Sequence, residues 1–337
     1  MTWGNNKNAE ESISAPSHAY GQWLYFENPI DAAEVVKPAP EHIGATVHLY
    51  TDGSCKGAND TFDKKAFAGW GCNMILERED SKKEMHFSGG LYNCDPHTAE
   101  LSAVYQGLLR IKEHCNVHIH SDSQYVISAL KNLPEFIEKR TKAIDLIPVN
   151  QRSMLEKREL GRLELWARVQ KQLERASIRG LTIQWIKSHQ MDDGKTLEEG
   201  KTRGSIRDIQ GNHTADRLSN IGVIQGIVTA LQKLSELASS NPQKYEWSSE
   251  VLRKNFSVSA FARETAAVWL TENPKLLTQD IINNILDPYT SRRIENCVRK
   301  GTKLETRHPQ LSQMLVSGEK PQQPQPRSSN VSTYPSA

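Results

Sequence analysis

Four acidic residues stand in short polar segments that would leave a carboxylate exposed beside a regular element. They are Asp52 in YTDGS, Glu100 in HTAEL, Asp122 in HSDSQYV and Asp216 in NHTADRLSN. Carboxylates that converge from separate elements repel one another unless a cation lies between them. A hard divalent cation such as Mg²⁺ prefers oxygen ligands, keeps some of its waters and suits phosphate chemistry. The four acids together therefore predict a metal-dependent nuclease.

Each of these acids, taken singly, also has a simpler interpretation. Asp52 could be a turn residue, because aspartate side chains stabilise turns. Glu100 could be a first-turn charge that interacts with a helix dipole, and Asp122 could cap a helix. Asp216 could be an exposed helical residue. The nuclease hypothesis thus depends on the four side chains meeting in one place.

The elements that would position these acids can be identified from hydrophobic periodicity. Apolar and alternating runs predict five strands, at residues 47–53, 67–77, 83–92, 116–122 and 181–189. Helical spacing predicts helices over 98–112, from 123–130 into a charged helical segment, and over 212–237. Three sequential strands favour an antiparallel meander, and the later strand–helix–strand units favour parallel pairing. We expect an α/β fold with a mixed five-stranded sheet flanked by helices.

The composition changes along the chain suggest four parts. Residues 1–44 are expected to form an irregular arm, and residues 45–238 the catalytic domain. Residues 239–317 show short helical patterns and are expected to form a small, mostly helical C-terminal region. Residues 318–337 are rich in Pro, Gln and Ser, which cannot build a core, so this tail is expected to be disordered.

Composition excludes several classes of protein. The chain is 37% hydrophobic and 24% charged with a net charge of +2, so any nucleic-acid footprint must come from local clusters. Its five cysteines match neither a CxxC metal site nor a disulfide framework. It has no basic-then-apolar leader and no run of roughly 18 apolar residues. We expect a cytoplasmic protein without membrane association.

Seven segments, in order between about Val47 and Asn220, resemble ribonuclease H of type 1, the enzymes that cut the RNA strand of RNA–DNA hybrids. The matching segments are YTDGSCKG, AGWG, TAELSAVYQGL, SDSQYVISAL, LWARVQKQL, IQWIKSH and NHTADRLSN. The resemblance implies an RNase H-like fold with the mixed five-stranded sheet. It also implies an RNA–DNA hybrid as the nucleic-acid partner.

The resemblance further implies roles for particular residues. Asp52, Glu100, Asp122 and Asp216 would be the metal-binding carboxylates, with Asp52 bridging two Mg²⁺ ions for which Mn²⁺ could substitute. His189 matches the family's mobile catalytic histidine, which would shuttle a proton or help release product. In this family the products carry 5′-phosphate and 3′-hydroxyl ends.

Substrate contacts are also implied. The family usually places Asn or Gln three residues before the catalytic Glu to recognise the ribose, and His97 stands there in this chain, which is a departure. The other expected substrate contacts are Ser54, Cys55, Lys56, Asn59, Ser123, Gln124 and Asn212. The family often has a basic handle, for which the candidates are Lys139, Arg140 and Lys142.

Two further departures separate this chain from the family pattern. The segment between His189 and Asn212 is far longer than the few residues typical of the family, and no motif of an N-terminal hybrid-binding module precedes Val47. The alternatives are another nuclease of the same superfold, of retroelement type or acting on duplex RNA, and a catalytically weak hybrid-binding module. The protein partner of the C-terminal region is unknown.

Overall fold

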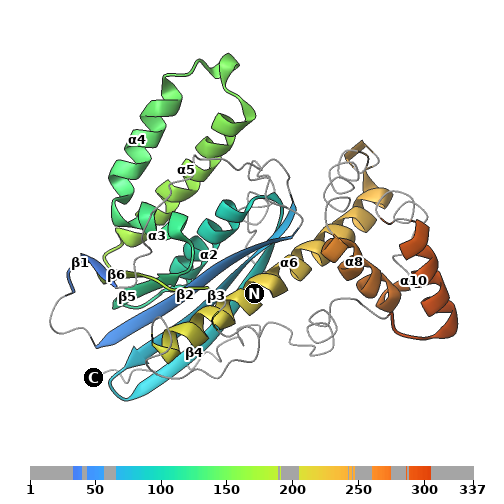
Figure 1. The fold of residues 1–337 in the computed structure, drawn as a ribbon, viewed down its shortest axis with the longest axis horizontal. Helices are drawn as coiled ribbons and strands as arrows, with labels where there is room; N and C mark the ends of the chain where they lie inside the picture. Colours follow the sequence, from blue (N-terminus) through green and yellow to red (C-terminus); the bar gives the residue numbers. More distant parts are fainter. Residues whose placement is uncertain are drawn as a thin grey trace, which may run out of the picture.

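The protein is represented by a computed structural model with a central sheet and helices on both of its faces (Figure 1). It describes residues 33–39, 44–56, 66–188, 190, 205–241, 243–244, 246, 260–274, 286 and 288–304. No helix within these ranges is long and apolar enough to cross a membrane.

The sheet is mixed, with six strands in the order β1-β6-β5-β2-β3-β4. The strands are β1 (Glu34–Lys37), β2 (Ala45–Lys56), β3 (Ala66–Arg78), β4 (Ser81–Cys94), β5 (Cys115–Ser121) and β6 (Ile178–Trp185). β2, β3 and β4 form the predicted antiparallel meander. β5 runs parallel to β2 and β6 runs parallel to β5, so the predicted mixed α/β sheet is confirmed.

The prediction of five strands was one short, because β1 adds an antiparallel edge strand next to β6. This strand lies in the segment that was expected to be an irregular arm. Lys37 Nζ donates to the Ile178 carbonyl at 2.6 Å, and Glu34 forms an ion pair with Lys131. A four-residue strand is too short to show a period, and contacts with distant residues hold it in place.

Four helices cover one face of the sheet: α2 (Pro96–Arg110), α3 (Gln124–Lys131), α4 (Leu133–Asp145) and α5 (Met154–Leu173). The main core lies between them and the sheet, where Leu49, Leu101, Leu108, Ile119 and Trp166 are fully buried. The outer parts of α4 and α5 project beyond the sheet as a hairpin, which we call the α4–α5 hairpin (Figure 1).

The opposite face carries the long helix α6 (Ile206–Ser240), which crosses β2, β3 and β4. Glycines in β3 and β4 allow its backbone to approach the sheet closely. A Cβ on Gly71 would lie 2.2 Å from the Ala215 carbonyl oxygen, and one on Gly90 would lie 2.1 Å from the Gly226 nitrogen. The AGWG segment therefore fixes the position of α6 over the end of β2.

Helix α6 is longer than predicted at both ends. It begins at Ile206, where the Ser205 side chain accepts from the Asp208 N–H, so residues 206–211 of the expected loop are helical. It continues past residue 238, where the catalytic domain was expected to end. A second core joins its far half to α8 (Ala260–Glu272) and α10 (Pro288–Lys300). Of the short helices that the sequence predicts in this region, those over 259–271 and 291–300 correspond to α8 and α10, and those near 249–254 and 278–286 fall almost entirely outside the described residues.

Candidate active site

Asp52 lies near the end of the central strand β2 and is 7% exposed. Its side chain is on the same face of the sheet as α6. Ser219 of α6 donates its hydroxyl to Asp52 Oδ2 at 2.5 Å. The strand fixes the backbone of Asp52 and the helix fixes its side chain, so the carboxylate is held before any ligand binds.

Glu100 stands in the second turn of α2. Asp95 caps this helix by accepting from the Thr98 N–H at 3.1 Å, and Pro96 opens its first turn. A Cβ on Gly53 would lie 2.2 Å from the Glu100 nitrogen, so the glycine after Asp52 lets the start of α2 lie against β2. Among the described residues, the buried Glu100 Oε2 has no hydrogen-bond partner.

Asp122 directly follows β5, next to the end of β2. Asn212 Nδ2 of α6 donates to Asp122 Oδ2 at 3.3 Å, and Trp185 Nε1 donates to the Asp122 carbonyl at 3.0 Å. These contacts come from α6 and β6, so three separate elements position this acid. The sequence did not indicate the contribution of Trp185.

The structure brings three of the four predicted acids together. One carboxylate oxygen from each of Asp52, Glu100 and Asp122 lies within 4.8 Å of the other two. Asp216 is outside this group, although its charge raises the pKa of both Asp52 and Glu100. Asn220 donates to Asp216 Oδ1 at 3.3 Å. The cluster is therefore three close carboxylates with a fourth nearby.

The pKa values of these acids show that the cluster suits a cation. Burial, followed by the charge of Asp122, raises the pKa of Asp52 to about 7, although the Ser219 hydroxyl opposes the shift. Burial and the charges of Asp52 and Asp122 raise the pKa of Glu100 well above its usual value. Because carboxylate oxygens are the donors that Mg²⁺ prefers, the unpartnered Glu100 Oε2 and its neighbours fit such an ion.

The residues predicted to contact substrate have varied surroundings. Ser54 Oγ donates to Asn220 Oδ1 at 3.1 Å, so it supports the neighbour of Asp216. Lys56 Nζ lies 5.7 Å from the ring centroid of Phe261 in α8. Burial raises the pKa of the Cys55 thiol. Ser123 caps α3, and Gln124 is the first residue of that helix. Asn59 and His189 lie outside the described residues.

His97 stands at the start of α2 and packs against Tyr125, with ring centroids 4.3 Å apart. Burial, followed by the charge of Arg162, lowers the pKa of His97 to about 4, so its ring is neutral at physiological pH. A neutral imidazole offers one hydrogen-bond donor and one acceptor.

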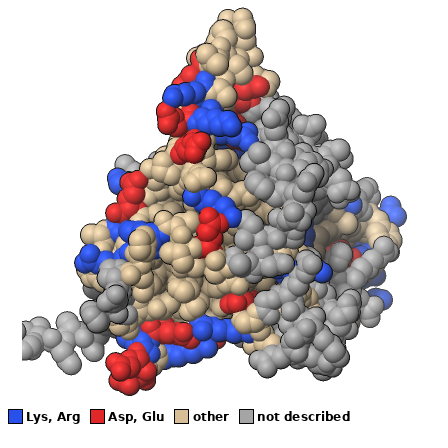
Figure 2. Space-filling view, turned by 60° about the vertical axis from the view of Figure 1, so that its left-hand side comes forward, with Lys and Arg blue, Asp and Glu red and all other residues tan. Residues whose placement is uncertain are grey.

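The predicted basic handle corresponds to the α4–α5 hairpin. Arg140 lies 3.6 Å from Glu159 and stacks over Phe136, and Lys142 pairs with Glu138. Figure 2 shows Lys and Arg mixed with Asp and Glu on the projection at the top, which ends in uncharged residues. Two of the three candidate basic residues are thus partly neutralised by acids within the hairpin.

A group of histidines that the sequence analysis did not single out lies on the α6 side of the sheet, formed by His48 of β2 with His118 and His120 of β5. Burial lowers the pKa of His48 to about 4 and of His120 to about 3, so both rings are neutral. The alternation in VHLY and VHIH placed them on one face, but only the strand register brings them together.

Comparisons with known proteins identify the family to which the chain is similar. The RNase H family model matches residues 44–224, from the residue before β2 into α6. Ribonuclease H of Bordetella bronchiseptica is 29% identical over 181 residues, covering 53% of this chain and 90% of that protein. Ribonuclease H of Bordetella avium is 31% identical over 182 residues, covering 52% and 90%. The crystal structure of LC9-RNase H1 matches with a TM-score of 0.37 at 12% identity, covering 54% and 75%.

Proposed function

This chain belongs to the ribonuclease H family, and from that premise we propose that it hydrolyses the RNA strand of RNA–DNA hybrids with two divalent metal ions. The observation that carries the proposal is the convergence of Asp52, Glu100 and Asp122 within 4.8 Å of one another. One buried and two half-buried acids at this separation are costly without a cation, because their charges repel one another and are only partly solvated.

The roles proposed for the acids are those that the resemblance to the family implies, and the grouping of Asp52, Glu100 and Asp122 supports them in part. Asp52, Glu100 and Asp122 would hold one Mg²⁺, and Asp52 with Asp216 would hold a second, with Mn²⁺ able to substitute. Mg²⁺ bound there supplies charge that activates water and stabilises the oxygen leaving phosphorus. Ser219, Asn212 and Asn220 keep the carboxylates in position. The expected products have 5′-phosphate and 3′-hydroxyl ends.

Recognition of the ribose is assigned to His97, at the position before Glu100 where relatives use an amide. Its neutral ring, held against Tyr125, could exchange one hydrogen bond with a 2′-hydroxyl. Amides have both a donor and an acceptor on one flexible group, whereas imidazole fixes them on opposite sides of the ring. The orientation of the ribose is therefore expected to differ from that in relatives.

A time course on a labelled hybrid tests the proposed function. RNA cleavage should require added Mg²⁺ or Mn²⁺ and should stop with EDTA. The fragments should carry 5′-phosphate and 3′-hydroxyl groups, read from their mobility before and after phosphatase treatment. Cleavage that continues in EDTA, or cyclic phosphate products, would contradict a metal-ion mechanism.

We expect His189→Ala to slow turnover without abolishing it. A residue that shuttles a proton or assists product release typically contributes about 10²–10⁴-fold, which is less than a metal ligand. The measurement is the single-turnover and steady-state rate on the same hybrid. Exposed His86 on β4 provides the control, because His86→Gln should leave both rates unchanged. A His189→Ala rate equal to the parent's would remove the residue from the mechanism.

Replacing Lys139, Arg140 and Lys142 together by alanine should raise KM for the hybrid and change kcat little. Two of these side chains already pair with acids in the hairpin, so we expect the loss of about one phosphate contact. The slope of log K against log[salt] should then fall by about 0.9 or less. Binding is measured in Ca²⁺, and alanine at Arg292, Arg293, Arg299 and Lys300 in α10 is the comparison. If the plots of log K against log[salt] are parallel for the parent and both variants, neither the basic residues of α4 nor those of α10 contact phosphate.

A further inference from the structure

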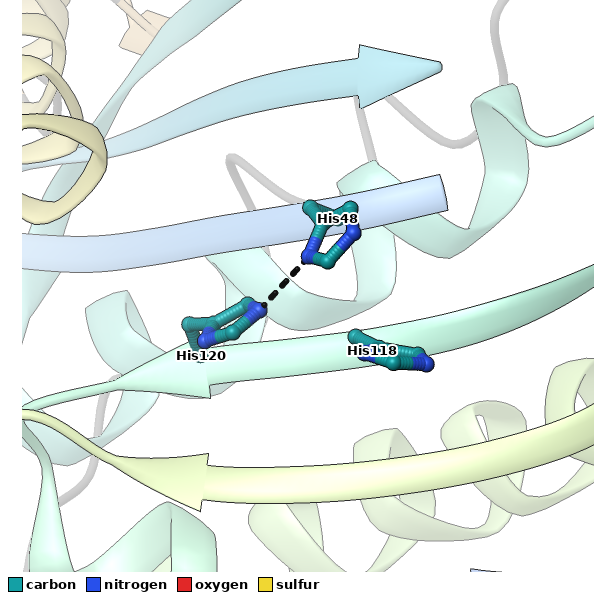
Figure 3. A group of neighbouring side chains, drawn as sticks. All are labelled: His48, His118 and His120. Atoms are coloured by element: carbon teal, nitrogen blue, oxygen red, sulfur yellow. Dashed lines mark hydrogen bonds between the residues drawn. The ribbon is translucent and has the colours of Figure 1, made fainter. Parts of the chain in front are cut away.

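Three histidines project from two neighbouring strands on the α6 side of the sheet (Figure 3). In the parallel register His48 of β2 lies opposite His118 of β5, and Tyr50 lies opposite His120. His120 is 3% exposed, and the other two histidines are half-buried. One ring nitrogen from each lies within 4.8 Å of the other two.

The two most buried rings face each other through single nitrogens. His48 Nδ1 and His120 Nε2 are 3.2 Å apart, shown as the dashed line in Figure 3. The opposite nitrogen of each ring is directed to a carboxylate. His48 Nε2 lies 3.6 Å from Glu77 Oε2, and His120 Nδ1 lies 3.7 Å from Asp208 Oδ1.

The protein groups leave part of this pair unsatisfied. The contact between the facing nitrogens takes up His48 Nδ1 and His120 Nε2. At 3.6 Å and 3.7 Å the two carboxylates are too far from the outer ring nitrogens to accept hydrogen bonds from them. In the described part of the chain, His120 Nδ1 is buried without a hydrogen-bond partner, which shows that the protein groups alone do not satisfy the pair.

A metal ion between the facing nitrogens would bind the lone pair of each. Each ring would then carry its N–H on the outer nitrogen, directed to its carboxylate. Zinc binds histidine nitrogens at about 2.0–2.1 Å, so two nitrogens in a tetrahedral site are about 3.3 Å apart. That separation is close to the 3.2 Å between His48 Nδ1 and His120 Nε2. A carboxylate beyond the other ring nitrogen is the usual support of a zinc-bound histidine, because it fixes the tautomer and the ring.

We propose that His48, His118 and His120 bind one divalent transition-metal ion of the zinc class, with water at the fourth position. Nitrogen donors favour such an ion over Mg²⁺. Glu77 and Asp208 orient two of the ligands. Asp208 is itself held by Tyr50, whose hydroxyl donates to Asp208 Oδ1 at 2.9 Å. The positive charge of Arg207 acts on all three histidines and opposes the binding of a cation. Its guanidinium lies 3.0 Å from Glu77 Oε1, and this ion pair offsets the charge.

This site is distinct from the carboxylate cluster, although it shares two strands with it. Asp52 is four residues further along β2 than His48, which corresponds to about 13 Å of strand. An ion at the histidines would tie β2 to β5, the strands that present Asp52 and Asp122. The site is therefore expected to stabilise the end of the sheet that carries Asp52 and Asp122, without taking part in hydrolysis.

Zinc titration of the metal-stripped full chain in excess Mg²⁺ tests the proposal. The Mg²⁺ occupies the carboxylates, so the remaining strong site should take one Zn²⁺ per chain. Co²⁺ at the same site should give the visible absorption of a four-coordinate, nitrogen-bound ion. His48→Gln, His118→Gln and His120→Gln should each weaken zinc binding more than about a hundredfold, which exceeds the usual loss on removing a supporting group. Asp208→Asn should weaken it about 10–100-fold.

Two control variants separate this site from other metal binding. His86→Gln, on the same sheet face, and Asp52→Asn, in the carboxylate cluster, should both bind Zn²⁺ as the parent does. A parent that binds no Zn²⁺ in excess Mg²⁺ overturns the proposal. His118 is half-buried, so His118→Gln should fold normally. A His118→Gln variant that folds and binds Zn²⁺ as tightly as the parent also overturns the proposal. Zinc binding lost in Asp52→Asn but kept in the histidine variants would place the ion at the carboxylates and would also overturn it.

Discussion

Replacing Asp52 by asparagine should reduce cleavage of the RNA–DNA hybrid to background while the fold and hybrid binding persist. Asp52 lies close to the carboxylates of Glu100 and Asp122 and accepts a hydrogen bond from Ser219. The amide removes the charge that both proposed ions need, yet its oxygen can still accept from Ser219. The rate is measured under single-turnover conditions, and Asp80→Asn, in the exposed β3–β4 turn, is the matched control. Activity within about tenfold of the parent would reject the assignment.

The same substitution should stabilise the metal-free protein at neutral and alkaline pH. The pKa of Asp52 is about 7 in the folded protein, whereas its ordinary value is 3.8. Between these values the folded state keeps a proton that the unfolded state has lost, so stability falls as the pH rises. Asp52→Asn should therefore unfold at higher denaturant concentration than the parent at pH 8, with the difference vanishing near pH 4. Added Mg²⁺ should stabilise the parent more than the variant.

Gly71→Ala should lower the free energy of unfolding by about 3 kcal/mol or more, at the upper end of the cost of overpacking. A Cβ at this position would lie 2.2 Å from the Ala215 oxygen and 2.3 Å from the Ser219 nitrogen, both of which are backbone atoms of α6. Neither can move unless the helix moves. Because α6 carries Asn212, Asp216 and Ser219, its displacement should also lower hydrolysis.

Chemical denaturation of the parent, Gly71→Ala and Gly44→Ala provides the measurement. Gly44 has open space around it, so alanine there meets no atom within 4 Å and should change stability little. If Gly71→Ala were as stable as Gly44→Ala, the close contact between β3 and α6 would not exist in solution. Loss of stability without loss of activity would separate the packing of α6 from the support of the site.

The central sheet, and the meeting of three of the acids at its end, could be predicted because their signals are local. Apolar alternation marks β2 and β5, and the alternating run ends in a polar segment with an acid, Asp52 within β2 and Asp122 directly after β5. β1 could not be found in this way, since its four residues are held by β6 and by the ion pair of Glu34. The start of α6 was missed because the whole segment between His189 and Asn212, which ends in Gly211, was expected to be a loop. A Cβ on Gly211 would lie 2.7 Å from the Tyr50 ring, so the glycine serves close packing instead.

The contacts that tune the site depend on register and on helix placement. His48, His118 and His120 look like solvent-facing residues in isolated strands, and only the parallel pairing of β2 with β5 groups them. Ser219 lies in a recognised motif, but its bond to Asp52 depends on where α6 crosses the sheet. The sequence could not show that Arg140, one of the candidate basic residues, lies beside Glu159.

A comparison of four substrates on one gel tests the central claim most directly. End-labelled RNA–DNA hybrid, duplex RNA, duplex DNA and single-stranded RNA are incubated with the full chain, each with Mg²⁺ and with EDTA. The proposed function predicts that only the RNA strand of the hybrid is cut, only with Mg²⁺, and not by Asp52→Asn. Preferential cutting of duplex RNA would point to another nuclease of this fold. Binding of the hybrid without cleavage in Mg²⁺ or Mn²⁺ would contradict the enzymatic claim.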